Sequence, residues 1–210
     1  MSRALTIESR DGLKLEAALD EPSSAAASLV LCHPHPQMGG TMNAPLLTAV
    51  RDELVKRGWN VLRFNFRGIG SSEGATGIGN DEIADALGAL DVLRGHGLPV
   101  AIAGWSFGAA VAVRVAAEES DLIACAAIAP AVDERPGVTA GIPGDVTPKV
   151  PTLVVVGAND ELISPARVAE WCDSVGATYV EVRGANHFFW GKYNDLATLI
   201  TDWLNERLTD

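Results

Sequence analysis

The sequence predicts an α/β fold, in which a mostly parallel sheet carries helices on both faces. Two observations lead to this prediction. Short apolar segments rich in Val, Ile, Leu and Ala alternate with segments of helical spacing along most of the chain. The first 20 residues differ, because two strand-like segments flank Asp11-Gly12, which is a strong hairpin turn signal. We therefore expect an antiparallel hairpin at one edge of the sheet.

The first half of the chain is expected to contain four strands and two helices. The strands are Ala4–Glu8, Leu13–Leu19, Ser28–Cys32 and Trp59–Phe64, and the helices are Asn43–Arg57 and Asp81–Arg94. Each strand is a short apolar or alternating run, whereas each helix repeats its apolar residues at helical spacing. Segment 33–40 contains two prolines and two glycines, so we expect a loop there without any helix.

The second half continues the alternation. The strands are Val100–Ala103, Ile123–Ile128, Thr152–Val156 and Thr178–Val182, and the helices are Ala109–Glu119, Ala166–Ser174 and Asp195–Leu208. Segment 131–150 interrupts the rhythm with three prolines and three glycines, which favour an irregular loop. That loop is too short for a cap domain. We therefore expect one domain, residues 1–210, with an open cleft.

Charge and composition disfavour several classes of function. The formal net charge is −11 and the pI is near 4.7, whereas nucleic acids and anionic lipid attract clustered Lys and Arg. No segment has the roughly 20 apolar residues of a membrane span, and the amino terminus lacks the build of a secretory signal.

The three cysteines Cys32, Cys125 and Cys172 form no C-x-x-C pair and are expected to be buried thiols. We expect a cytoplasmic monomer or homodimer.

The most specific motif is Gly104-Trp105-Ser106-Phe107-Gly108, which follows an apolar strand and precedes a helix. A serine on such a tight strand-to-helix turn takes a strained backbone conformation that crowds its neighbours, so glycine is needed two residues to either side. The hydroxyl then projects at the amino end of a helix, whose dipole favours negative charge. Ser106 is therefore the candidate nucleophile.

A serine nucleophile needs a base, and a base needs an orienting acid. Of the four histidines, His187 follows the last expected strand and would reach the same sheet edge as Ser106. Asp160 follows the strand before it and is the preferred acid, although an Asx turn or a helix N-cap would also explain it. Asp133 is the alternative acid.

An oxyanion intermediate requires two convergent N–H donors. One is expected from Phe107, the residue after the nucleophile. The other is expected from His35, because the neighbouring prolines cannot donate, with Gln37 as the fallback. A metal site at His33 and His35 is disfavoured, since no further ligand has the right spacing.

Other residues are expected to shape the cleft. Trp105, Phe188, Gly39 and Gly40 are the candidate pocket residues, and Phe107, Phe189 and Trp190 are further aromatic candidates for its wall or for the core. The glycine-rich loop 67–79 lacks a phosphate-binding fingerprint and carries a Glu. We expect Arg67 in this loop to form a salt bridge with a carboxylate.

The chain resembles the α/β-hydrolase superfamily over essentially its whole length. Its candidate nucleophile, acid and base also follow one another in the order of that superfamily, as Ser106, Asp160 and His187. The segments His33-Pro34-His35-Pro36, Gly39-Gly40 and Arg67-Gly68-Ile69-Gly70-Ser71 look like those of the small, lidless hydrolases near dienelactone hydrolase. That enzyme has a cysteine nucleophile where this chain has Ser106, so its substrate is not carried over.

The resemblance implies a serine hydrolase that cleaves carboxylic esters through an acyl-enzyme on Ser106, without cofactor or metal. The expected partner is a small-molecule ester, and the missing lid favours a short acyl chain. Three alternatives remain: a serine peptidase, an acyltransferase, and a non-catalytic protein that binds a ligand in the same pocket.

Overall fold

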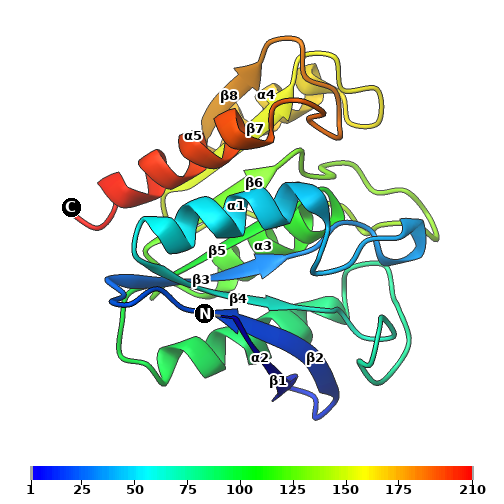
Figure 1. Ribbon diagram of the computed structural model, residues 1–210. Helices are drawn as coiled ribbons and strands as arrows, with labels where there is room; N and C mark the ends of the chain where they lie inside the picture. The colour runs from blue at the N-terminus through cyan, green and yellow to red at the C-terminus, as the bar shows by residue number, and fades with distance from the viewer. Residues whose placement is uncertain (1, 210) are drawn as a thin grey trace.

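The computed structural model describes residues 2–209. These residues contain an eight-stranded sheet in the order β1-β2-β4-β3-β5-β6-β7-β8 (Figure 1). The strands are β1 (Ser2–Glu8), β2 (Lys14–Asp20), β3 (Ala27–Cys32), β4 (Trp59–Phe64), β5 (Val100–Trp105), β6 (Ala124–Ile128), β7 (Thr152–Gly157) and β8 (Thr178–Val182). The β1–β2 and β2–β4 pairs are antiparallel, and all other pairs are parallel. The prediction of a mostly parallel sheet with an N-terminal hairpin is confirmed.

Helices cover both faces of the sheet. They are α1 (Pro45–Lys56), α2 (Glu82–Arg94), α3 (Phe107–Glu118), α4 (Pro165–Val175) and α5 (Tyr193–Glu206). The first and last of them, α1 and α5, pack together on one face, while α2 and α3 lie on the other (Figure 1). All residues of β3 to β7 are buried between these layers, which explains why those strands are continuous apolar runs in the sequence.

The expectation of no helix in segment 33–40 was wrong, because a short 3-10 helix, η1 (Pro36–Met38), lies there. Pro36 occupies its first turn, where a backbone N–H would have no helical partner, so the missing donor costs nothing. The Nδ1 atom of His35 accepts a hydrogen bond from the Gln37 N–H at 3.2 Å and caps the turn. Gly39 ends it in the left-handed conformation.

Residues 129–151, between β6 and β7, contain an isolated bridge between Arg135 and Thr139 but no named helix or strand. The described chain therefore inserts no cap domain at this point, as the sequence predicted. The same segment reaches across to the loop after β3, where the carbonyl of Val138 accepts a hydrogen bond from Nε2 of His35 at 2.8 Å. Within residues 2–209, no helix is long and apolar enough to cross a membrane.

Candidate active site

Ser106 lies on the turn that joins β5 to α3, and its backbone has φ 55° and ψ −114°. This conformation is rare for a residue with a side chain and marks local strain. The flanking glycines make the turn sterically possible. A Cβ at Gly104 would lie 2.3 Å from the carbonyl oxygen of Gly108, and a Cβ at Gly108 would lie 2.4 Å from that of His33. The turn leads directly into α3, which starts at Phe107, two residues before the predicted start at Ala109.

Three of the predicted residues are brought together at the carboxyl edge of the sheet. Nε2 of His187 lies 3.1 Å from Oγ of Ser106, and Nδ1 of His187 lies 2.8 Å from Oδ2 of Asp160. An ionised carboxylate only accepts hydrogen bonds, so the His187 proton sits on Nδ1. Nε2 is then the acceptor for the Ser106 hydroxyl. This is the arrangement that a serine nucleophile and its base require.

Asp160 is held from both sides. While Oδ2 faces His187, Oδ1 accepts hydrogen bonds from the N–H groups of Leu162 and Ile163 at 2.9 and 2.8 Å. The side chain is fully buried. Asp160 therefore forms an Asx turn, the alternative explanation that the sequence offered, and accepts the hydrogen bond from His187 with its other oxygen. The N-cap of α4 is Ser164, which accepts from the Arg167 N–H.

The alternative acid, Asp133, points elsewhere. Its Oδ1 lies 3.3 Å from Nη2 of Arg167, and both side chains are 57% exposed. No hydrogen bond joins Asp133 to His187 in the part of the chain that the structure describes. The geometry therefore favours Asp160.

Close backbone packing fixes the loop that carries His187. A Cβ at Gly157, the last residue of β7, would lie 2.6 Å from the carbonyl oxygen of Ala185. The indole Nε1 of Trp105 donates to the carbonyl of His187 at 3.2 Å. Glycine at the end of β7 thus lets the two loops approach, and Trp105 ties the imidazole loop to the end of β5.

The two N–H groups expected to bind an oxyanion, those of Phe107 and His35, have no hydrogen-bond acceptor within residues 2–209. The fallback donor, the Gln37 N–H, is already engaged by Nδ1 of His35. Phe107 and His35 are neighbours, with ring centroids 5.1 Å apart. The two side chains therefore pack against each other beside the turn, and both N–H groups stay candidate donors.

His33 has a structural role that the sequence did not reveal. Its Nε2 accepts from the Phe66 N–H at 3.0 Å, and its Nδ1 donates to the Pro34 carbonyl at 2.7 Å. Burial disfavours the charged ring and lowers the pKa of His33 to about 4. Both nitrogens of His33 and of His35 are used by backbone groups, so neither ring offers one to a metal.

The prediction that Arg67 binds a carboxylate is consistent with the structure, which pairs it with two. Its guanidinium lies 2.7 Å from Oδ1 of the buried Asp85 and 2.9 Å from Oδ1 of Asp11. Burial, the largest influence, raises the pKa of Asp85. This cluster ties the loop after β4 to α2 and the N-terminal hairpin.

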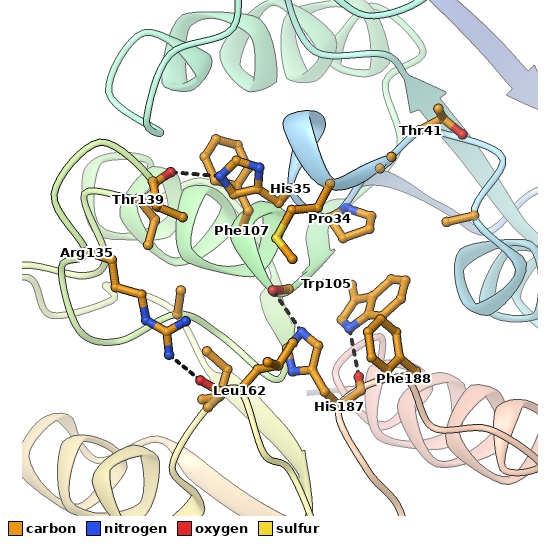
Figure 2. Close-up of a pocket in the computed structure, with 18 of the residues that line it drawn as sticks. Pro34, His35, Thr41, Trp105, Phe107, Arg135, Thr139, Leu162, His187 and Phe188 are labelled. Carbon is orange, nitrogen blue, oxygen red and sulfur yellow. Dashed lines mark hydrogen bonds between the residues drawn. The ribbon is translucent and has the colours of Figure 1, made fainter.

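A cavity of about 400 Å³ opens at Ser106 and His187. Residues from five segments line it: 34–45, 105–107, 131–139, 162–163 and 187–188. Figure 2 shows Trp105 and Phe188 on one side of His187, with Arg135 and Leu162 on the other. The sequence pointed to the first side only, because the irregular segment 131–150 and Leu162 carry no motif.

Not every aromatic candidate reaches the cavity. Trp105, Phe107 and Phe188 line it, together with Gly39 and Gly40. Phe189 is completely buried in the core with φ 53°, and Trp190 is 68% exposed and lies outside the lining. Successive residues of this turn thus point in different directions, which the residue types alone do not indicate.

Fold and site together define a hydrolase of the α/β serine hydrolase class that lacks a lid. Residues 23–147 match the family described as serine aminopeptidase, S33, and the chain belongs to this family. An uncharacterized protein from Rickettsia prowazekii is 32% identical over 192 residues, which cover 86% of this chain and 79% of that protein.

Two solved structures are similar over nearly the full length. An α/β hydrolase of unknown function from Agrobacterium tumefaciens has a TM-score of 0.87 and 28% identity, covering 99% of this chain and 97% of its own. An α/β serine hydrolase without lid from Xanthomonas campestris has a TM-score of 0.87 and 30% identity, covering 98% and 94%.

Proposed function

We propose that this protein is a carboxylesterase that forms an acyl-enzyme on Ser106. The observation that carries the proposal is the continuous hydrogen-bonded series from Asp160 through His187 to Ser106, which opens on an apolar cavity. A buried carboxylate, a neutral imidazole and a hydroxyl in this order can move one proton from the nucleophile.

In the acylation half-reaction, Oγ of Ser106 attacks the ester carbonyl carbon while Nε2 of His187 takes the hydroxyl proton. Asp160 stabilises the imidazolium that forms. The carbonyl oxygen becomes an oxyanion, which the N–H groups of Phe107 and His35 bind. The tetrahedral intermediate collapses, the alcohol leaves with the proton from His187, and the acyl group stays on Ser106.

Deacylation repeats these steps with water as the nucleophile. His187 takes a proton from water, the resulting hydroxide attacks the acyl carbonyl, and the same N–H groups bind the second oxyanion. Collapse releases the carboxylic acid and returns the proton to Oγ of Ser106. No cofactor or metal takes part in these steps.

The lining of the cavity favours esters over the substrates of an aminopeptidase, the activity in the family's name. An aminopeptidase must hold a protonated α-amine, for which a carboxylate in the cavity is the natural partner. Among the described lining residues, none is an aspartate or glutamate, and the only one that is always charged is Arg135. A cavity without a cap domain also lets water reach the acyl-enzyme, which favours hydrolysis over transfer. The missing lid predicted a short acyl chain, and a rise of kcat/KM along the acyl series described below would contradict that prediction.

Hydrolysis of p-nitrophenyl acetate and butyrate by wild type and Ser106→Ala tests the proposal. We expect wild-type turnover and a loss of at least about 10³-fold in the variant. A fluorophosphonate probe should label wild type once per chain and leave Ser106→Ala unlabelled. Equal, slow hydrolysis by both proteins together with no labelling would contradict the proposal and favour a ligand-binding protein. Labelling without ester turnover would point to amide hydrolysis or acyl transfer.

We also propose a cytoplasmic location and a monomeric or homodimeric state. All three cysteines are buried and free, which is typical of proteins in a reducing compartment. Fractionation of cells that produce the protein would test its location, and sedimentation of the purified protein would test its oligomeric state.

A further inference from the structure

The exposed large apolar side chains of residues 2–209 gather around the cavity. They are Met38, Val138, Leu162, Phe188 and Trp190, which we call the apolar collar. Four of them line the cavity. The fifth, Trp190, stacks on Phe188 with ring centroids 5.1 Å apart and an interplanar angle of 14°. Single exposed apolar residues need no explanation, but a contiguous patch marks a binding surface.

The collar is assembled from four separate segments. Met38 comes from η1, Val138 from segment 131–150, Leu162 from the loop after β7, and Phe188 and Trp190 from the loop after β8. Figure 2 shows Leu162 and Phe188 on opposite sides of the opening. The collar therefore surrounds the mouth of the cavity instead of forming a flat patch beside it, and it continues the apolar interior outward.

The collar and cavity offer little to a charged ligand. Among the described residues that line the cavity, Arg135 is the only one that is always charged, and it donates a hydrogen bond to the carbonyl of Leu162. The chain as a whole has a net charge of −11, which opposes the approach of anionic surfaces. An uncharged hydrocarbon fits this chemistry best.

We propose that the apolar collar binds the hydrocarbon part of a substrate that extends out of the cavity, so that an uncharged ester with a long alkyl chain is the preferred substrate. The inference rests on the proposed esterase function. The chain can belong to the acyl group or to the alcohol, and the experiment below separates these two sources.

A second copy of this protein is a weaker occupant. Stable interfaces use about 20 to 30 residues on each side. The collar has five residues, and they encircle an opening that leads to Ser106. A dimer formed through it would cover the cavity that the proposed reaction needs.

The test compares two substrate series below their critical micelle concentrations. One lengthens the acyl chain from p-nitrophenyl acetate to octanoate, and the other lengthens the alcohol from ethyl to octyl acetate. Removing one methylene fully from water raises kcat/KM by about fourfold, so burying two methylenes contributes roughly 15-fold when both are fully removed from water and about tenfold when the burial is incomplete. We expect wild-type kcat/KM to rise with chain length in one series, and that series identifies the end that contacts the collar.

Trp190→Ala is the informative variant, because Trp190 lies outside the cavity lining and is 68% exposed. We expect it to lower kcat/KM about tenfold for the octyl or octanoyl ester and less than about twofold for the shortest ester. Trp203→Ala is the control. Trp203 lies in the last turn of α5 and does not line the cavity, so this variant should leave the chain-length dependence unchanged.

Three results would overturn the inference. The first is a flat chain-length dependence in wild type with Ser106-dependent hydrolysis of acetate intact. The second is an equal loss for short and long esters in Trp190→Ala. The third is a wild-type dimer in sedimentation that Trp190→Ala converts to monomer. If no ester is hydrolysed in a Ser106-dependent way, the proposed function itself fails, and labelling of Ser106 separates the two cases.

Discussion

The backbone N–H of Phe66 donates a hydrogen bond to Nε2 of His33 over 3.0 Å. Because Nε2 accepts, the single ring proton lies on Nδ1, which donates to the Pro34 carbonyl. His33 thus joins the loop after β3, which carries one candidate oxyanion donor, to the loop after β4. The ring does this only in its neutral form. Burial lowers its pKa to about 4.

We predict that acidification destabilises the protein between pH 6.5 and pH 4. In this range an unfolded histidine binds a proton, whereas the folded His33 does not, so the free energy of unfolding rises with pH. The difference between about 6.5 and about 4 corresponds to at most about 3 kcal/mol lost on going from neutral to acid pH. Urea unfolding at half-unit pH steps measures this loss.

His33→Gln is the control for that measurement. The amide can accept from Phe66 and donate toward Pro34, but it does not titrate. We expect the variant to be less stable at pH 7 and to lose less stability on acidification. Parallel pH dependence in wild type and variant would assign the acid sensitivity to other groups.

Gly40→Ala is predicted to disrupt the loop that carries His35. A Cβ at Gly40 would lie 2.0 Å from the carbonyl oxygen of Pro34, so the backbone on one side must move. Displacement of one oxyanion donor lowers kcat by about 10²-fold to 10³-fold. Gly144→Ala is the matched control, since nothing lies within 4 Å of its Cβ position. Ester turnover and circular dichroism of both variants show whether the loss is local.

The cysteines are predicted to be unreactive in the native protein. Burial raises the pKa of Cys125 and of Cys172 to about 12, and that of Cys32 well above its usual value. The thiolate is the reactive form, so Ellman's reagent at pH 8 should label less than one thiol per folded chain within minutes. In 8 M urea all three should react. Rapid labelling of the folded chain would show that one of these thiols is accessible.

The fold could be predicted from the sequence because the signals are local. The Asp11-Gly12 turn and the apolar runs of the buried strands report their own conformation. The element ends were less accurate. Helix α3 begins at Phe107 because the turn at Ser106 leads directly into it. Pro36 concealed η1, since proline disfavours a helix interior but suits a first turn.

The three candidate catalytic residues could be predicted because each lies in a loop that follows an expected strand. Ser106, Asp160 and His187 each follow a parallel strand, and these strands end at one sheet edge. The far wall of the cavity depends on how segment 131–150 folds back, for which Val138 bonding to His35 is one contact. Such a contact joins residues 103 positions apart, and no local pattern encodes it.

The choice of acid yields the sharpest prediction about catalysis. Asp160→Asn keeps the shape of the side chain but removes the charge that fixes the His187 proton on Nδ1. We expect kcat for p-nitrophenyl acetate to fall by about three to four orders of magnitude. The amide oxygen introduced by this substitution can still accept from the N–H groups of Leu162 and Ile163, so the turn should persist and thermal unfolding should change little.

Asp133→Asn is the matched control for Asp160→Asn, because it makes the same chemical change on an exposed side chain that contacts Arg167 and not His187. Its turnover is expected to stay within about twofold of wild type, since an exposed ion pair contributes little. Steady-state kinetics of the two variants, measured from pH 6 to 9, decide the assignment. Loss of activity in Asp133→Asn with retention in Asp160→Asn would exchange the two roles and would mean that the loop after β6 rearranges when substrate binds.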